Sequence, residues 1–169
     1  MTFANAARKL RIKGTEFIWF DEGAYGVVFV DKARKRVRKI YKAIDGKPSA
    51  HCLEVFEAET RAYDIASRSD DLKAIVPVYY GKCEELVIID GTGNDVTGEF
   101  HPHLAFESEF IEGRFVKSSF ASEAERDRIN ELFWKSKVLH TIDTSVCLTD
   151  GKITKVIDFA MKEIELWAT

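Results

Sequence analysis

The chain has 169 residues, of which 46% are hydrophobic and 31% are charged, a composition typical of a folded domain. Its apolar runs are far shorter than the roughly 20 residues that a membrane span needs, and its first residues lack the apolar core of a secretory signal. Its three cysteines are too widely spaced for a metal pattern or a disulfide framework. We therefore expect reduced thiols in a cytoplasmic protein that does not contact a membrane.

The predicted secondary structure consists mainly of strands, with two helices. Apolar and β-branched runs predict strands at 17–20, 27–30, 37–41, 75–80, 85–90, 104–111, 145–148 and 153–158. Turns or loops are predicted at 32–35, 45–48, 91–103 and 150–151. One helix is predicted from residue 48 or 49 to about 67, and a second follows the capping box of Ser122 and Glu125. These elements predict an α+β fold.

The net charge of −3 conceals an uneven distribution of charge. Residues 1–50 contain twelve Lys or Arg and five Asp or Glu, whereas the remainder contains thirteen and twenty-three. The basic residues of segment 32–42 make it a candidate site for a phosphate-bearing ligand. A solvated basic surface without a ligand is the alternative.

Two glycines in the first predicted hairpin indicate a candidate phosphate-binding turn. Gly23 and Gly26 would let backbone N–H groups approach an anion without an intervening side chain. On the return strand, the period of two puts Val37 and Lys39 on one face and Arg38 on the other. Lys39 could then reach phosphates, and Lys42 is the alternative in a different register. A simple hairpin turn also explains the glycines.

The first predicted helix carries a carboxylate on its apolar face. Glu59 projects close to Phe56 and Tyr63 at helical spacing. A buried carboxylate is costly unless it is paired, and Lys39 is the expected partner. A carboxylate at the rim of the core is the alternative.

The last predicted strand leads directly into Asp158. An acidic side chain that leaves a buried strand is well placed to bind a metal ion, although acidic residues are also common at strand ends.

Together and in this order, these segments resemble the protein-kinase-like superfamily, which includes bacterial small-molecule kinases and short kinase-like effector proteins. Asp21 to Val28 resembles the glycine-rich loop, with Asp21 in place of the first glycine, and Ile153 to Ala160 resembles the DFG motif, with Ala160 in place of its glycine. The other matching segments are Val37 to Lys39 for the third-strand lysine, Glu59 for its helical partner, Ile75 to Val78 for the fourth strand, and Ala105 to Gly113 for the fifth strand and hinge. The resemblance covers about residues 14–162.

The resemblance implies a two-lobed fold. Residues 1–113 would form an antiparallel five-stranded N-lobe with one αC-type helix and the hinge. Residues 114–169 would form a much reduced C-lobe of one helix and a β-hairpin.

The resemblance also implies ATP and Mg²⁺ as ligands. Asp158 would bind the metal, and the side chains of Lys39, Glu59 and Asp158 would converge in one cleft under the 23–26 hairpin. The other residues expected to contact the nucleotide are Gly23, Gly26, Val28 under the adenine ring, Val37, and the backbone at Glu109 and Ile111.

The catalytic loop departs from the family pattern. Counting back from Asp158, the metal-binding asparagine of the family falls on Ser145 and its catalytic aspartate on His140. His140 could act as a base only if neutral, and Asp143 could substitute only in a remodelled loop. Because the sequence continues for only about ten residues after Asp158, we expect no activation segment. We therefore expect slow or absent phosphoryl transfer.

Three hypotheses follow. The first is a pseudokinase that binds ATP weakly and acts through a protein partner. The second is an active atypical phosphotransferase that uses Asp143 or His140. The third is a nucleic-acid-binding module that uses residues 32–42, which the acidic remainder and the lack of aromatic residues paired with the lysines disfavour.

Overall fold

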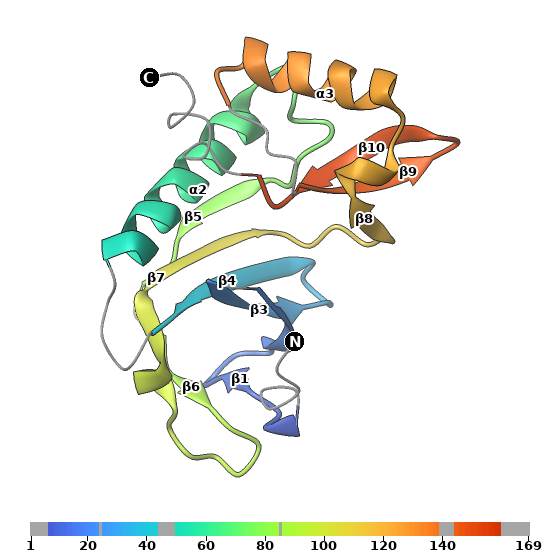
Figure 1. The fold of residues 1–169 in the computed structure, drawn as a ribbon. Coiled ribbons are helices and arrows are strands. Elements are labelled where there is room, and N and C mark those ends of the chain that lie inside the picture. Colours follow the sequence, from blue (N-terminus) through green and yellow to red (C-terminus); the bar gives the residue numbers. More distant parts are fainter. Residues whose placement is uncertain (1–6, 24, 44–49, 85, 139–143, 160–169) are drawn as a thin grey trace. The chain divides into compact units, whose positions relative to one another are not determined.

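The computed structural model describes residues 7–23, 25–43, 50–84, 86–138 and 144–159 (Figure 1). Its internal contacts gather into two units. Unit 1 draws on residues 1–56 and 80–110, and unit 2 draws on residues 57–79 and 111–169. None of the helices in the described ranges is long and apolar enough to cross a membrane.

Unit 1 is built on a seven-stranded sheet in the order β5-β7-β4-β3-β2-β1-β6. The strands are β1 (Arg11–Ile12), β2 (Ile18–Glu22), β3 (Gly26–Asp31), β4 (Arg36–Lys42), β5 (Tyr79–Lys82), β6 (Ile88–Ile89) and β7 (Phe100–Glu109), with a 3₁₀ turn, η1 (Thr97–Glu99), before β7. The pairs β1–β2, β1–β6, β2–β3, β3–β4 and β4–β7 are antiparallel.

The sheet curls around an apolar core. Ile12 of β1 and Ile88 of β6 share one buried cluster with Phe29 and Ile40 from the middle of the sheet. Because strands from the end and the middle of the sheet contribute to the same core, the sheet must bend back on itself. On the opposite face of β4, Tyr41 meets Phe56 of α2 (Ala50–Arg68) edge to face, with ring centroids 5.5 Å apart.

Unit 2 combines the later part of α2 with a helix and a three-stranded sheet. Its other elements are β8 (Phe115–Lys117), η2 (Ser118–Phe120), α3 (Glu123–Lys135), β9 (Ser145–Thr149) and β10 (Lys152–Ile157), with the sheet order β10-β9-β8. Phe159, fully buried, stacks on Tyr63 of α2 at 4.5 Å and meets Phe133 of α3 edge to face at 5.0 Å. Aromatic packing thus joins the two helices to the end of the hairpin.

The start of α3 is tied to the β9–β10 hairpin. The Ser122 hydroxyl accepts a hydrogen bond from the Glu125 N–H, as the capping box predicts. The Glu125 carboxylate instead accepts from the Ile153 N–H at 2.8 Å, and Arg128 donates to the Ile153 carbonyl at 2.9 Å. The N–H and the carbonyl of Ile153 in β10 therefore both bind side chains of α3, and these two hydrogen bonds join the helix to the hairpin.

The α+β class and the antiparallel character of the main sheet are confirmed, but the sheet has seven strands where five are predicted. The strand predicted at 85–90 is present only as the two-residue strand β6, and the two-residue strand β1 is not predicted, because it is too short to leave an alternating pattern. The three-residue strand β8 is not predicted either.

Two predicted boundaries are also wrong. Residues 70–75 form turns, and β5 begins only at Tyr79. Leu72 and Val76 are both buried and lie four residues apart, which is the spacing of a helical turn. The chain around residue 75 is therefore not extended, and the strand begins later than predicted. Strand β7 starts at Phe100, inside the predicted loop 91–103. The division into lobes after residue 113 stays a prediction.

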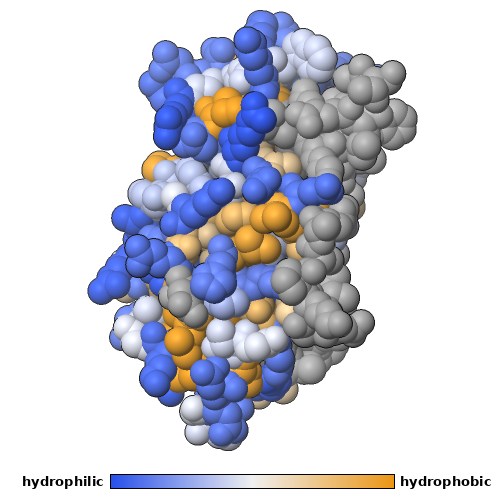
Figure 2. Space-filling view, turned by 90° about the vertical axis from the view of Figure 1, so that its left-hand side faces the viewer, coloured by the Kyte–Doolittle hydropathy of each residue, from blue (hydrophilic) through white to orange (hydrophobic). Residues whose placement is uncertain are grey.

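The surface is mainly hydrophilic on the face that Figure 2 shows, with scattered apolar patches. The most exposed large apolar side chains of the described residues are Phe120 and Trp134, at 76% and 68%. Both belong to unit 2. Isolated exposed apolar residues are ordinary on folded domains.

Candidate functional site

The turn between β2 and β3 is held by its own backbone and by one lysine. The Gly23 N–H donates to the Gly26 carbonyl at 2.9 Å, so the turn itself uses this donor. The Lys42 ammonium donates to the Gly23 carbonyl at 2.7 Å and pairs with the Glu22 carboxylate at 2.9 Å. Lys42, the alternative phosphate contact, therefore holds the turn in place.

The Lys39 side chain lies against the second glycine of this turn, although the strand register pairs Gly26 with Tyr41. A Cβ placed on Gly26 would come within 3.2 Å of the Lys39 Cε and 3.3 Å of its Cγ, and within 3.2 Å of the Ile40 carbonyl oxygen. The Lys39 ammonium lies over the Tyr41 ring, 5.5 Å from its centroid. A glycine at position 26 is thus what lets the Lys39 side chain lie flat against β3.

The strand register brings the expected nucleotide contacts of unit 1 onto one hairpin. Val28 pairs with Lys39, and Val37 pairs with Val30 of β3 and with Ser108 of β7. Both valines are half-buried. The hairpin therefore carries Gly26, Val28, Val37 and Lys39 on neighbouring positions, as the sequence predicts.

The predicted hinge contacts lie at the end of β7. Glu109 is the last residue of this strand and pairs with Arg36, and the Phe110 N–H donates to the Lys35 carbonyl. Ile111, half-buried, is the first residue of unit 2 after the strand.

Part of the positive charge of the basic segment 32–42 is offset by nearby carboxylates. Arg36 and Arg38 both contact Glu107, with N–O distances of 3.4 and 2.8 Å, and Lys42 contacts Glu22. The exposed residues Lys32, Arg34 and Lys35 form the turn between β3 and β4. Fewer cationic groups therefore face solvent than the sequence suggests, which weakens the nucleic-acid hypothesis.

Unit 2 brings two predicted acidic residues to one tyrosine. Glu59, 4% exposed, lies on the buried face of α2, as predicted. The Tyr63 hydroxyl accepts a hydrogen bond from the Asp158 N–H at 3.1 Å. Burial, followed by the negative charges of Asp158 and Glu59, raises the pKa of Tyr63 well above its usual value. The phenol therefore stays neutral.

The Asp158 side chain is exposed at the end of β10. Its backbone has a φ of 59°, in the left-handed region that non-glycine residues seldom adopt. This conformation turns the chain so that Phe159 enters the core while the Asp158 carboxylate faces outward. Such backbone conformations are enriched at functional sites.

Ser145, the other predicted metal ligand, starts the neighbouring strand. It pairs with Ile157, the residue before Asp158. A carboxylate such as that of Asp158 suits a Mg²⁺ ion that also keeps waters and phosphate oxygens. No group of three or more His, Cys, Asp or Glu side chains with metal-binding geometry occurs among the described residues.

The three side chains that are expected to converge in one cleft belong to two different units. Glu59 and Asp158 act on the same tyrosine, whereas Lys39 belongs to unit 1. Convergence of all three therefore stays a prediction. His140 and Asp143 lie outside the described residues.

Sequence reasoning did not identify Tyr63 as the link between the acidic residues. Its position on the apolar face of the helix was visible, but its hydroxyl partner is a backbone group 95 residues away in the chain. The contacts of Lys42 with the Gly23 carbonyl and the Glu22 carboxylate are not predicted from the sequence, and its role as the alternative phosphate contact stays a prediction.

Comparison of the chain with protein-family models, with curated proteins and with solved structures finds no match. Any functional proposal therefore depends on the residues and their geometry.

Proposed function

We propose that this protein is a kinase-like pseudokinase, which binds ATP with Mg²⁺ weakly, transfers phosphate slowly or not at all, and acts through a protein partner. The observation that carries the proposal is the packing of Lys39 across Gly26, which holds an ammonium group beside a glycine turn. The exposed Asp158 carboxylate at the end of β10 supports it with a side chain that could bind magnesium.

The proposed roles follow from charge. The Lys39 ammonium would contact phosphate oxygens, and the Asp158 carboxylate, with Ser145, would contribute to a magnesium site. When bound, Mg²⁺ would neutralise the charge on the phosphates. Without the aspartate that normally orients the nucleophile, transfer is expected to be slower by about 10²–10⁴-fold.

The proposal is tested by thermal unfolding in the presence of ATP and Mg²⁺. Occupancy at a hundredfold excess over Kd stabilises a protein by about 2.7 kcal/mol, which a melting experiment detects easily. Lys39→Met is expected to remove the shift, whereas Lys32→Met, the matched control on the exposed turn, is expected to retain it. An equal loss in both variants would indicate general attraction to the basic surface and would contradict a specific site.

Labelled γ-phosphate separates the pseudokinase from an active atypical phosphotransferase. We expect no labelling of the protein above the level of Lys39→Met. Labelling that is lost in Asp143→Asn or His140→Ala would favour the active enzyme.

A further inference from the structure

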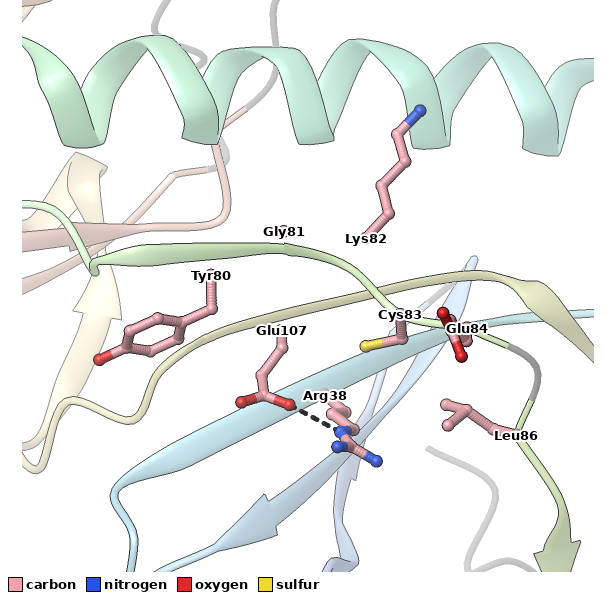
Figure 3. Close-up of a pocket in the computed structure, with 8 residues that line it drawn as sticks. All are labelled: Arg38, Tyr80, Gly81, Lys82, Cys83, Glu84, Leu86 and Glu107. Atoms are coloured by element: carbon pink, nitrogen blue, oxygen red, sulfur yellow. Dashed lines mark hydrogen bonds and ion pairs between the residues drawn. The ribbon is translucent and has the colours of Figure 1, made fainter.

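Unit 1 contains a pocket of about 340 Å³ beside β5, the edge strand of the seven-stranded sheet (Figure 3). This volume lies at the lower end of the range of about 300–1,000 Å³ for small-molecule sites. Arg38 lines the pocket, whereas Lys39, the next residue in the strand, projects from the opposite face. No residue expected to contact the nucleotide contributes to its lining.

The floor of the pocket is an ion pair with excess positive charge. The Arg38 Nε donates to the Glu107 carboxylate at 2.8 Å, and Arg36 lies 3.4 Å from the other oxygen of the same carboxylate. Two guanidinium groups thus share one carboxylate. The Arg38 and Glu107 side chains are only 22% and 19% exposed, so screening by solvent is reduced.

One edge of the Arg38 guanidinium is still available for a ligand. Its Cζ lies 4.3 Å from the centroid of the Phe17 ring, and its Nε is used by Glu107. Its two Nη atoms make no hydrogen bond to any residue that the structure describes. A guanidinium edge with two N–H donors matches the two oxygens of a carboxylate.

The backbone conformation of Gly81 determines which side chains of β5 line the pocket. Gly81 has a φ of 115°, which side-chain-bearing residues rarely adopt. Tyr80 and Cys83 point to the pocket side of the strand, whereas Lys82 points to the other side, where its ammonium lies 5.2 Å from the Phe56 ring centroid (Figure 3). Burial raises the pKa of Cys83 to about 11, so the thiol is neutral at pH 7 and does not repel an anion.

Carboxylates limit the charge that the pocket can accept. Glu107 in the floor and Glu84 in the lining would repel a ligand with two negative charges, such as inorganic phosphate. The Arg36 guanidinium covers one face of the Tyr80 ring, 3.3 Å from its centroid, and the remaining exposed part of this ring and the Leu86 side chain provide apolar contact area. The pocket therefore suits a single negative charge attached to an apolar body.

We propose that this pocket binds a small organic monocarboxylate. The carboxylate accepts hydrogen bonds from the two Nη atoms of Arg38, and its apolar part contacts Tyr80 and Leu86. This site is distinct from the proposed nucleotide site and does not depend on it.

The test is an NMR titration of the ¹⁵N-labelled protein with benzoate at pH 7, with benzamide as the neutral analogue of the same shape. Benzoate is expected to give saturable shifts at the amides of Gly81, Cys83 and Leu86, and benzamide is expected to give none. Arg38→Met is expected to weaken benzoate binding at least tenfold. Arg34→Met, the matched control on an exposed arginine outside the pocket, is expected to leave it unchanged.

Glu107→Gln provides a variant with an effect of opposite sign. It removes a negative charge next to the ligand, so benzoate should bind several-fold more tightly. Weaker benzoate binding by a folded Glu107→Gln protein would overturn the proposal. This variant therefore tests the proposal even if the Arg38→Met protein does not fold. Lys39→Met should not change benzoate binding, which separates this site from the nucleotide site.

Other outcomes would also overturn the proposal. They are the absence of saturable shifts, equal binding of benzamide, tighter binding of inorganic phosphate than of benzoate, and binding of a short peptide with a free C-terminus but not of benzoate.

Discussion

The two glycines of the β2–β3 turn have different constraints at the residue scale. A Cβ on Gly26 would crowd the Lys39 side chain and the Ile40 carbonyl, whereas a Cβ on Gly23 would meet no atom within 4 Å. Neither residue has a left-handed φ. Close approach, and not backbone conformation, is therefore the reason for a glycine at position 26.

We predict that Gly26→Val destabilises the protein by about 1–3 kcal/mol, because a branched side chain overpacks the contact with β4. Nucleotide-dependent stabilisation should fall as well, since Lys39 must move. Gly23→Ala is the control and should change the unfolding free energy by less than about 0.5 kcal/mol. Urea unfolding of both variants measures the difference, and equal effects would contradict the role assigned to Gly26.

At the scale of elements, Glu125 connects α3 to the β9–β10 hairpin. Hydrogen bonding to Arg128 and to the Ile153 N–H lowers the pKa of Glu125 below its usual value of 4.5. A carboxyl with a lowered pKa in the folded state stabilises the protein above its unfolded-state pKa, and this contribution is lost as the pH falls through the folded-state pKa.

We predict that Glu125→Ala lowers the urea midpoint of unfolding at pH 7, and that the difference from wild type shrinks as the pH falls below about 4.5. Glu125→Gln retains an acceptor for the Ile153 N–H and should have a smaller effect. Glu123→Gln, in the same helical turn but exposed, is the control. A difference that stays constant between pH 7 and pH 3 would show that the charge of Glu125 does not contribute.

At the scale of the whole molecule, α2 supplies residues to both units. Phe56 packs on Tyr41 in unit 1, and Tyr63 packs on Phe159 in unit 2. Isolated helices shorter than about 12–15 residues are marginal in water. Neither part of this 19-residue helix is therefore expected to persist if the other unfolds.

We predict that Phe159→Ala destabilises the chain by about 3–5 kcal/mol, and that amide hydrogen exchange accelerates in β3 and β4 as well as in β9 and β10. Tyr25→Ala, at an exposed position, serves as the control. Acceleration confined to unit 2 would mean that the two units unfold independently.

The sequence alone determined most of the local structure. Alternation and turn residues located β2, β3, β4, β9 and β10, and helical spacing located α2, α3 and the buried face of Glu59, because these features depend on neighbouring residues. The Ser122 cap and the position of Lys39 beside the glycine turn were predictable for the same reason.

The tertiary structure decided which segments that are far apart in the sequence contact one another. The short strands β1 and β8 exist only because a partner strand completes their hydrogen bonds, and no local pattern encodes that partner. The Tyr63–Asp158 hydrogen bond and the arginine pair on Glu107 likewise join residues at least 69 positions apart. Such contacts depend on the path of the whole chain, which periodicity along a single segment does not specify.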